Sequence, residues 1–533
     1  MAWPDDPPPA IRHELHFGDR LLRCFAERPR SLYGLLETAV LRDPDGVALI
    51  DGGARISYRA LAERVQRLAA GLAAQGIRPG DRLALLLANR PEFAVALFAA
   101  ARLGAIAVPL SVREQTPGLQ HMLAQSGAKL LLHEPDLADR LPAPASLPGL
   151  RRAALQGEGD DRFAALPDGG ALAPAPHRPE EEDVAVILCT SGTTGRPKGA
   201  MLTHLNLAHS VVHYALGRGL SRRDRALLAV PASHAIGLVG MLLSMVHVGG
   251  STVLMRAFEA RRLLELVAAE HVTVTGLVPA MYHLCLLEPG FADLDLSSWR
   301  IAGYGGAPMP ETTIAELRRR LPRLQLMNAY GATETTAAAT MMPPGQTARH
   351  PDSVGRALPC AEVRVIDGAG REVPPGVMGE VWIRGPMVVP GYWANDAATR
   401  ESFVAGFWRS GDVGRIDAAG YLRIDDRLKD MINRAGYKVF SIEVEQALGE
   451  HPEIVEAAVV ARPDPVLGER VHAFVVTRDG RLTAEEVRAF AALRLADYKV
   501  PDSVTVGGEP LPRNPMGKLQ KGVLRRRLAE RAP

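Results

Sequence analysis

The chain has 533 residues, of which 47% are hydrophobic and 23% are charged, as in an ordinary globular protein. Single cores stop growing at roughly 250–300 residues, so this length predicts more than one domain. The net charge of +2 gives no reason to expect a nucleic-acid partner.

The first residues and the cysteines bear on the cellular compartment. Residues 1–9 are acidic and proline-rich, whereas a secretory signal would be basic and then apolar. No apolar run is long enough to cross a bilayer. The four cysteines have neither metal-ligand spacing nor a disulfide pattern, which favours reduced thiols. We therefore expect a cytoplasmic protein without a transmembrane segment; the cysteines are Cys24, Cys189, Cys285 and Cys360.

The first 124 residues alternate between helical and strand patterns. Helical periodicity at 58–74 is followed by an apolar strand pattern at 82–87. A second helix is predicted at 93–102 and a second strand at 105–110. Such alternation indicates layers of helices on a parallel sheet. The following stretch from 141 to 179 is rich in Ala, Pro and Gly and is predicted to be an irregular connection.

A buried strand at 184–188 runs into a loop suited to bind an anion. Glycines let backbone N–H groups approach the anion, hydroxyls add donors and a lysine adds positive charge. The spacing differs from the common GxxxxGK[ST] loop, and no Ser or Thr follows the lysine. The sequence predicts a phosphate-binding loop formed by Thr190, Ser191, Gly192, Thr193, Thr194, Gly195 and Lys198.

Strand and helix signals resume between 225 and 326. The apolar run 235–246 fits a buried helix. Short strand-like pieces with Gly and Pro turns between 363 and 424 indicate a β-rich subdomain. A charged break at 425–430 is predicted to separate two domains, which are residues 1–426 and residues 427–533.

The second predicted domain is small and mixed α/β. Helices are expected near 443–448 and 484–495, and strands at 457–461 and 471–477. The predicted fold class is therefore α/β, with a large N-terminal domain of layered α/β subdomains plus a β-rich subdomain. The small C-terminal domain is expected to move as a lid.

Several motifs in this order resemble the adenylate-forming enzymes, which include acyl-CoA synthetases, stand-alone adenylation domains and luciferases. The chain is most similar to bacterial acid–CoA ligases, and the resemblance covers nearly its whole length. Each motif alone could be an ordinary turn, helix cap or solvated charge run; their combination carries the resemblance. The motifs lie at residues 190–199, 303–308, 330–334, 408–412, 427–439 and 512–519.

The resemblance implies how ATP is bound. Tyr330 would stack on adenine, followed by Gly331, and Thr333 would meet phosphate. Glu334 would hold Mg²⁺, which prefers one or two carboxylates together with phosphate oxygens and water. The adenine loop would consist of Gly305, Gly306, Ala307 and Pro308.

The resemblance also assigns residues near the domain boundary. Asp412 would accept the ribose hydroxyls, and Arg427 would contact ribose or phosphate. Lys429 would be the pivot on which the small domain turns between two half-reactions. Gly436 would let its loop lie close to the thiol of CoA, with Lys438 beside it.

Two further residues are implied for catalysis. Lys518 would be carried on the lid and stabilise the charge that accumulates during adenylation. His234 would line the acyl pocket. The amino-acid-activating branch carries aspartate next to this point, whereas this chain has Ala235.

The acyl pocket is predicted from neighbourhood in sequence. The walls are expected to be apolar, so dicarboxylates and free amino acids should be poor substrates. A medium-chain aliphatic or an aryl acid is expected instead. The candidate wall residues are His234, Val239, Met241, Leu242, Leu243, Gly276, Leu277, Val278, Tyr304, Ala329 and Ala338.

The resemblance thus implies an acid–thiol ligase that uses ATP, Mg²⁺ and CoA and converts a carboxylate into a thioester through an acyl-adenylate. One alternative is a ligase that loads the acyl group onto a separate carrier protein. A second is a nucleotide-binding regulator without catalysis, against which the retained Glu334 and Lys518 argue. A homodimer is left open.

Overall fold

The computed structural model describes residues 9–156, 173–190, 197–478, 481–513 and 519–530. By its internal contacts the chain divides into two compact units. The first comprises Met1–Val363 and Ile383–Arg409, and the second comprises Arg364–Trp382 and Ser410–Pro533. This division passes through the β-rich subdomain, and the boundary at residue 426 stays a prediction.

The first unit contains a sheet that leads to the predicted phosphate loop. Among the described residues it has six strands in the order β10-β9-β6-β5-β7-β8. The predicted strands at 82–87, 105–110 and 184–188 are confirmed. The region 141–179 is not wholly irregular, because β8 adds an edge strand there. The strands are β5 (Arg82–Leu86), β6 (Ile106–Pro109), β7 (Leu130–His133), β8 (Arg151–Ala154), β9 (Val184–Thr190) and β10 (Lys198–Thr203).

A second sheet of the first unit has nine described strands, in the order β17-β16-β15-β14-β13-β11-β12-β3-β4. Its neighbours β13, β14 and β15 are parallel, so their carboxyl ends meet at one edge. The strands are β3 (Val47–Asp51), β4 (Ala54–Ser57), β11 (Arg225–Leu228), β12 (Ser251–Leu254), β13 (Val274–Leu277), β14 (Ile301–Tyr304), β15 (Gln325–Gly331), β16 (Ala338–Met341) and β17 (Arg356–Ala357).

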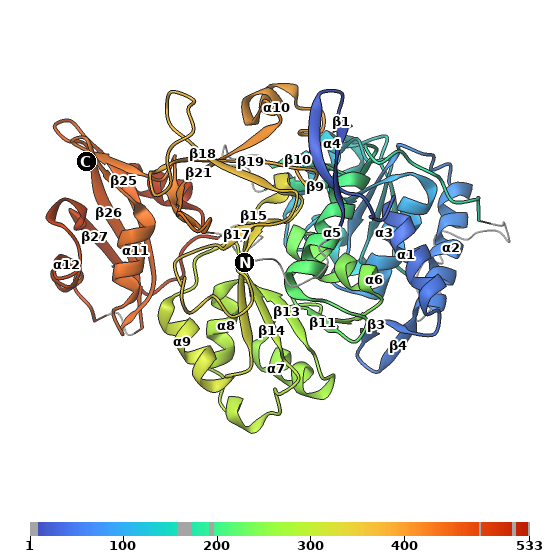
Figure 1. Cartoon of the computed structure of the whole chain (residues 1–533), viewed down its shortest axis with the longest axis horizontal. Coiled ribbons are helices and arrows are strands. Elements are labelled where there is room, and N and C mark those ends of the chain that lie inside the picture. Colours follow the sequence, from blue (N-terminus) through green and yellow to red (C-terminus); the bar gives the residue numbers. More distant parts are fainter. Residues whose placement is uncertain (1–8, 157–172, 191–196, 479–480, 514–518, 531–533) are drawn as a thin grey trace. The chain divides into compact units, whose positions relative to one another are not determined.

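Helices cover both sheets of this unit, and α7, α8 and α9 lie against the β13–β14 part (Figure 1). The helix predicted at 58–74 has these bounds, and α3 is buried along all 13 residues. The long helices are α1 (Leu32–Arg42), α2 (Tyr58–Ala74), α3 (Pro91–Leu103), α4 (Thr116–Ser126), α5 (His204–Arg218), α7 (Ala260–Ala269), α8 (Pro279–Leu286) and α9 (Glu311–Arg320). The shorter ones are α6 (Ser244–Val248), α10 (Asp396–Ser402), η1 (Pro135–Arg140), η2 (Pro144–Ser146), η5 (Phe291–Asp293) and η6 (Thr333–Thr335).

The apolar run predicted as a helix at 235–246 is helical but has two parts. It begins as the π-helix η4 (Ile236–Leu243) and continues as α6. The wider turns bring Ser244 Oγ within 2.6 Å of the carbonyl oxygen of Val239, five residues earlier. Such π-turns are often found at functional sites.

The N-terminal hairpin stands as a separate two-stranded sheet of β1 (Ile11–His16) and β2 (Arg20–Phe25). The β-rich subdomain has the order β18-β19-β21-β20, with β22 paired to β21. Its strands are β18 (Glu362–Ile366), β19 (Gly379–Arg384), β20 (Phe403–Val404), β21 (Phe407–Ile416) and β22 (Leu422–Arg427).

The last 100 residues form the predicted small α/β fold. The described strands follow the order β24-β23-β26-β25, and β27 pairs with β26. Both predicted strands are longer than expected, because β25 and β26 pair from Ile454 to Asp464. The elements are β23 (Ile432–Arg434), β24 (Tyr437–Val439), α11 (Ser441–Gly449), β25 (Ile454–Asp464), β26 (Gly468–Thr477), α12 (Ala484–Ala492), η7 (Asp497–Lys499), β27 (Ser503–Gly507) and α13 (Lys521–Glu530).

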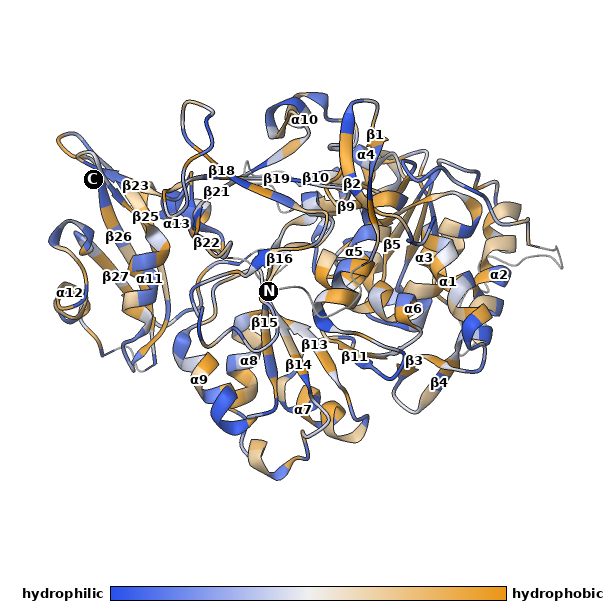
Figure 2. Cartoon of the chain, in the orientation of Figure 1, coloured by the Kyte–Doolittle hydropathy of each residue, from blue (hydrophilic) through white to orange (hydrophobic). Residues whose placement is uncertain are grey.

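Hydropathy follows burial in these elements. Helix α9 has one apolar and one charged face (Figure 2), and it buries Ile314 and Leu317 while its last turn carries three arginines. Within the described ranges, no helix combines the length and the apolar character needed to cross a bilayer.

Candidate functional site

The two ends of the predicted phosphate loop lie on an antiparallel hairpin. Strand β9 ends at Thr190, β10 begins at Lys198, and these two residues are direct cross-strand partners. The pairing therefore fixes the lysine beside the start of the loop. The other predicted loop residues lie outside the described part of the chain: Ser191, Gly192, Thr193, Thr194 and Gly195.

A short path of side chains connects this hairpin with the predicted metal ligand. The ammonium of Lys198 lies 4.9 Å from the centre of the Tyr392 ring. The Tyr392 hydroxyl donates to Oε1 of Glu334 at 2.7 Å. Burial and the neighbouring carboxylate raise the pKa of Tyr392, which keeps the hydroxyl protonated as a donor. Lysine, phenol and carboxylate therefore come together although they are far apart in sequence.

Backbone contacts hold Tyr392 in this position. Gly391 accepts a hydrogen bond from the N–H of Met201, and the N–H of Trp393 donates to Gly199 at 2.7 Å. An isolated antiparallel bridge joins Ala200 to Tyr392. The segment 391–393 thus extends the phosphate hairpin.

Glu334 lies on the one-turn helix η6 directly after β15. Its side chain is buried, and its carbonyl accepts the N–H of Val389 at 2.9 Å. Gly331 is required just before it, because a Cβ there would lie 1.8 Å from the carbonyl oxygen of Ala337. Tyr330 and Thr333 remain partly exposed beside the buried carboxylate. The structure brings these predicted residues together on one turn.

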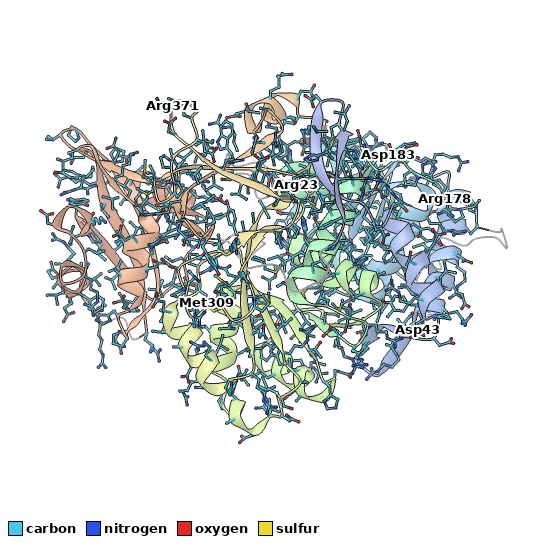
Figure 3. All side chains as sticks on the ribbon, viewed as in Figure 1. Arg23, Asp43, Arg178, Asp183, Met309 and Arg371 are labelled. Carbon is cyan, nitrogen blue, oxygen red and sulfur yellow. The ribbon has the colours of Figure 1, made fainter. Side chains whose placement is uncertain are left out.

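The predicted adenine loop follows β14, the strand next to β15. Gly305 is buried, and a Cβ on it would meet the carbonyl oxygen of Ala329 at 2.3 Å. Gly306 has a φ of +80°, which glycine adopts readily. Gly306, Ala307 and Pro308 are exposed just before Met309, which is labelled in Figure 3. The loop and Tyr330 therefore lie at adjacent ends of parallel strands.

His234 precedes the π-helix. Its carbonyl accepts the N–H of Leu238 at 2.7 Å, so its backbone belongs to the start of the helix. On the facing sheet, a Cβ on Gly276 would lie 2.7 Å from the sulfur of Met241 and 3.4 Å from Ile236. The π-helix therefore packs directly over β13, and the acyl pocket expected in this region stays a prediction.

In the second unit, the two predicted ribose contacts are paired. Asp412 on β21 lies opposite Arg427 on β22, and Arg427 Nε is 3.0 Å from Asp412 Oδ1. The Asp412 N–H binds Ser410 Oγ at 3.0 Å. A carboxylate held in this way is an ionised acceptor suited to a diol.

The predicted pivot is exposed but attached to the last helix. Arg525 of α13 donates to the carbonyl oxygen of Lys429 at 3.2 Å and to Asp430 Oδ1 at 2.6 Å. The tight turn beyond it, between β23 and β24, contains Gly436 with a φ of +90°. Lys438 follows on β24 and is exposed.

A buried polar cluster lies next to this pivot. Ser441 Oγ is 2.8 Å from a carboxylate oxygen of Asp426, and the Lys521 ammonium donates to Ser441 Oγ at 2.7 Å. Lys521 is also 2.6 Å from Glu445. Burial raises the pKa values of both carboxyl groups. Ser441 is the first residue of α11, and its side chain connects Asp426 with Lys521 of α13. Lys518 lies outside the described residues.

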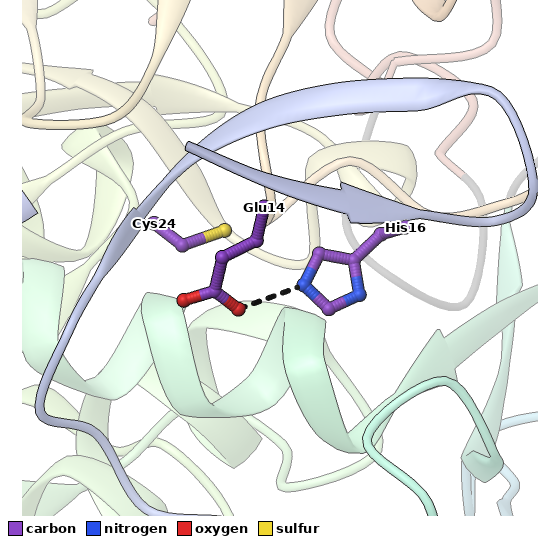
Figure 4. A group of neighbouring side chains, drawn as sticks. All are labelled: Glu14, His16 and Cys24. Carbon is purple, nitrogen blue, oxygen red and sulfur yellow. Dashed lines mark hydrogen bonds and ion pairs between the residues drawn. The ribbon is translucent and has the colours of Figure 1, made fainter. Parts of the chain in front are cut away.

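A second group of potential metal ligands lies in the N-terminal hairpin (Figure 4). Glu14, His16 and Cys24 offer donor atoms within 4.8 Å of one another. Both carboxylate oxygens of Glu14, however, accept hydrogen bonds from the fully buried Arg28 at 2.9 and 2.6 Å. Burial also raises the pKa of Cys24 to about 12, so the thiol stays protonated. The group is an ion-pair cluster.

Comparison with known proteins agrees with this geometry. The family profile "AMP-binding enzyme" matches residues 36–393, and "AMP-binding enzyme C-terminal domain" matches residues 443–518. The chain belongs to the AMP-binding enzyme family. It is an acid–thiol ligase that uses ATP, Mg²⁺ and CoA.

Relatives and a solved structure of this family match over nearly the whole chain. A feruloyl-CoA synthase of Amycolatopsis sp is 40% identical over 91% of this chain and 96% of its own. The fatty acid–[acyl-carrier-protein] ligase ScoC of Streptomyces coeruleorubidus is 34% identical over 92% and 94%. The structure of o-succinylbenzoate coenzyme A synthetase (MenE) from Bacillus subtilis with ATP and magnesium ion has a TM-score of 0.83 at 29% identity, covering 94% and 99%.

The sequence did not single out two residues that the structure brings to these groups. Tyr392 donates to Glu334, but 58 residues separate the two, so no local pattern connects them. Lys521, which joins the cluster at Ser441, has only the signal of a charged residue three positions after Lys518.

Proposed function

We propose that this chain joins a medium-chain or aryl carboxylic acid to CoA, with ATP cleaved to AMP and pyrophosphate through an acyl-adenylate. The observation that carries this proposal is the path Lys198–Tyr392–Glu334. It places a cation and a buried carboxylate at the end of the phosphate hairpin. ATP in the presence of Mg²⁺ requires both charges.

The first half-reaction forms the adenylate. A carboxylate oxygen of the acid attacks the α-phosphorus of ATP, and pyrophosphate leaves. Lys198 and the loop from Thr190 to Gly195 bind the phosphates, Tyr330 and the Gly305–Pro308 loop bind adenine, and Thr333 contacts phosphate. Lys518 stabilises the charge of the transition state, and no protein nucleophile is needed.

Glu334 fits the role of magnesium ligand. Tyr392 fixes one carboxylate oxygen, which sets the orientation of the group and leaves the other oxygen for a metal. When bound, Mg²⁺ neutralises phosphate charge. The buried backbone around Glu334 keeps the carboxylate from turning away.

The second half-reaction transfers the acyl group. The CoA thiol attacks the acyl carbonyl carbon, and AMP leaves with the electron pair of the cleaved bond. Lys429 is the pivot that exchanges the two states, and the turn at Gly436 with Lys438 approaches the thiol. Asp412 and Arg427 hold the ribose in both steps.

The substrate class is supported by the apolar helix near His234 and by the relatives. Leu238, Val239, Leu242 and Leu243 of η4 are buried, so a long apolar acyl group is favoured over acetate. The 40% identical relative is named for feruloyl, an aryl acid.

An acyl carrier protein is the second candidate acceptor, because the relative ScoC is named as a ligase for one. Residues Gly436 and Lys438 would then approach a carrier-bound thiol. A catalytically inactive nucleotide-binding regulator is disfavoured by the retained Glu334 and Lys518. Cytoplasmic localisation and a homodimer remain predictions, the second of which light scattering of the purified protein would test.

Pyrophosphate release tests the proposal. The panel contains acetate, hexanoate, octanoate, benzoate, a hydroxycinnamate, malonate and phenylalanine, each with CoA or with a holo-carrier protein. We expect the highest kcat/KM with a hydroxycinnamate, benzoate or octanoate, and thioester only with CoA. A preference for malonate, acetate or phenylalanine would show that the pocket wall is misplaced. No release with any acid would refute the catalytic proposal.

A further inference from the structure

Arg218 is a buried cation that pairs with no carboxylate among the described residues. It is the last residue of α5 and is 4% exposed. Its Nη1 donates to the carbonyl oxygen of Gly240 at 3.1 Å and contacts the sulfur of Met241 at 3.7 Å. Its Nε is buried without an acceptor. Such a group costs free energy unless something accepts its hydrogen bonds.

Other buried arginines of the described chain are satisfied differently. Arg28 binds Glu14 and Glu181, and Arg90 binds Glu92 and Glu134. Arg102 also pairs with no described carboxylate, and its Nε is likewise buried without an acceptor. Both of its terminal nitrogens are used, however, by the Tyr33 hydroxyl at 2.6 Å and the Pro174 carbonyl at 2.9 Å. Arg218 differs because Nη1 is its one nitrogen with a described acceptor.

The other terminal nitrogen of the guanidinium, Nη2, lies against glycine residues of the sheet. A Cβ on Gly303 would lie 2.4 Å from Arg218 Nη2. Gly303 is the neighbour of Gly276 in the register of β13 and β14, and Gly276 lies under Met241. Neither glycine has a side chain, and among the described residues Arg218 packs over Gly303 while Met241 and Ile236 pack over Gly276.

The segments around Arg218 are those predicted to line the acyl pocket. Its guanidinium lies 4.5 Å from the ring of Tyr214, which also packs against Gly240 and bonds the backbone of Ala338. Gly303 precedes the Gly305–Pro308 loop by two residues, which is about 7 Å along a strand. This spacing puts Arg218 within the length of an acyl group whose carboxylate lies at that loop.

We propose that Arg218 binds an oxygen acceptor at the distal end of the acyl substrate, and that this acceptor is the phenolic oxygen of a hydroxylated aryl acid. This inference rests on the proposed ligase function and names its substrate. A benzene ring spans the apolar distance from the loop, and the Tyr214 and Met241 side chains suit its edges.

A single acceptor fits better than a distal carboxylate. A carboxylate binds arginine best through two parallel hydrogen bonds. Here the carbonyl of Gly240 occupies Nη1, and Nε is closed off. Nη2 alone remains, and one N–H···O bond suits a hydroxyl oxygen. In this proposal the apolar wall expected from sequence contains one cation, which donates a hydrogen bond to the end of the acid opposite the carboxylate.

The experiment compares matched acids in the wild-type enzyme with ATP and CoA. The aryl acids are cinnamate, 4-methylcinnamate and 4-hydroxycinnamate, and the aliphatic pair is octanoate and octanedioate. Loss of a hydrogen bond to a charged group typically changes affinity by about 10–100-fold. We expect 4-hydroxycinnamate to exceed 4-methylcinnamate in kcat/KM by that factor. A ratio near one, with both acids turned over, would overturn the assignment and leave the ligase function intact.

Variants locate the effect. Arg218→Met should reduce the hydroxyl-to-methyl ratio to near one, and Arg218→Lys should retain part of it. Arg102→Met is the matched control, because it removes another buried guanidinium, and it should keep the wild-type ratio. An unchanged ratio in Arg218→Met would overturn the inference.

Two further outcomes are decisive. A preference for octanedioate over octanoate that is lost in Arg218→Met would show that the partner is a carboxylate, against the aryl assignment. Absence of turnover with every acid would refute the proposed function and this inference together. Melting temperatures of each variant separate loss of selectivity from loss of folding.

Discussion

Glu334 in the first unit and Gly436 in the second differ in how firmly their surroundings hold them. The Glu334 side chain is buried, and the residue accepts hydrogen bonds from Tyr392 and Val389. Gly436 is exposed and has a φ of +90°, and no described residue beyond its two chain neighbours has an atom within 4 Å of the position of a Cβ. The first residue is held in place before any ligand arrives, whereas the backbone at the second has room to change.

This difference follows the chemistry proposed for each. Binding charged phosphates benefits from groups that need no reorganisation. A pivot that serves two half-reactions needs a backbone that can change its conformation at low cost, as the exposed turn at Gly436 can. We expect substitutions in the first unit to affect both steps and those around Gly436 to affect the second.

The largest effect is expected at the buried carboxylate. Glu334→Ala should lower pyrophosphate release by about 10³, because it removes the proposed magnesium ligand. Tyr392→Phe should cost only about 10-fold, since it removes the bond that orients the ligand. Rates at several magnesium concentrations provide the measurement. A Glu334→Ala enzyme with normal magnesium dependence would show that another residue holds the metal.

The next effect concerns the lid lysine. Lys518→Ala should lower adenylate formation by about 10²–10³, because one electrostatic stabiliser of the transition state is lost. Thioester formation from supplied acyl-adenylate should be nearly unchanged. Lys521→Ala provides a comparison, because it removes a nearby lysine that contacts Ser441 and Glu445. Equal loss in both half-reactions for Lys518→Ala would indicate a structural role.

A smaller effect is expected at the turn. Gly436→Leu should spare pyrophosphate release and lower thioester formation, because the side chain would stand between the turn and the thiol. Gly436→Ala is the control: it has space, so it carries only the strain of a positive φ, about 1–2 kcal/mol. Similar thioester rates in Gly436→Leu and wild type would remove the proposed role of the turn.

The smallest expected effect is on stability: as the pH falls, the first unit should lose more stability than the second. Burial lowers the pKa of His204 and His213 to about 4 and of His209 to about 3 in the first unit. Their stabilising contribution is complete above pH 6.5 and is lost as the pH falls toward 4, because the unfolded chain then binds more protons. His209 and His204 also accept the N–H groups of Phe25 and Leu32, respectively.

In the second unit, burial lowers the pKa of His472 to about 4 in the same way. Calorimetry at pH 7.5 and 5.0 should therefore show a larger drop in melting temperature, by several degrees, for the transition of the first unit. Equal shifts of both transitions would contradict this expectation.

Sequence patterns predicted the regular elements well where the pattern is local. The helix 58–74 has its expected bounds, and the strand that precedes the phosphate loop lies where expected. The π-helix was not predicted, because periodicity does not distinguish its wider turns from those of an α-helix. Strand β8 was missed because it is four residues long in a region rich in Ala, Pro and Gly.

The site could be predicted only as far as its motifs reach. Tyr330, Thr333 and Glu334 are adjacent in sequence, so their common turn follows directly. Tyr392 and Glu334 are 58 residues apart in sequence, so no local sequence pattern predicts their contact. The space that Arg218 occupies exists because two glycines on other strands lack side chains. A glycine in the sequence does not indicate which distant side chain packs over it.

The two units differ in their cysteine content. All four are in the first unit, and three are buried there. Burial raises each thiol pKa to about 12, so reaction with maleimides should be slow. The second unit contains no cysteine at all. One cysteine introduced on its surface would therefore accept a fluorophore selectively, and the emission would report in real time whether this unit makes the proposed swing.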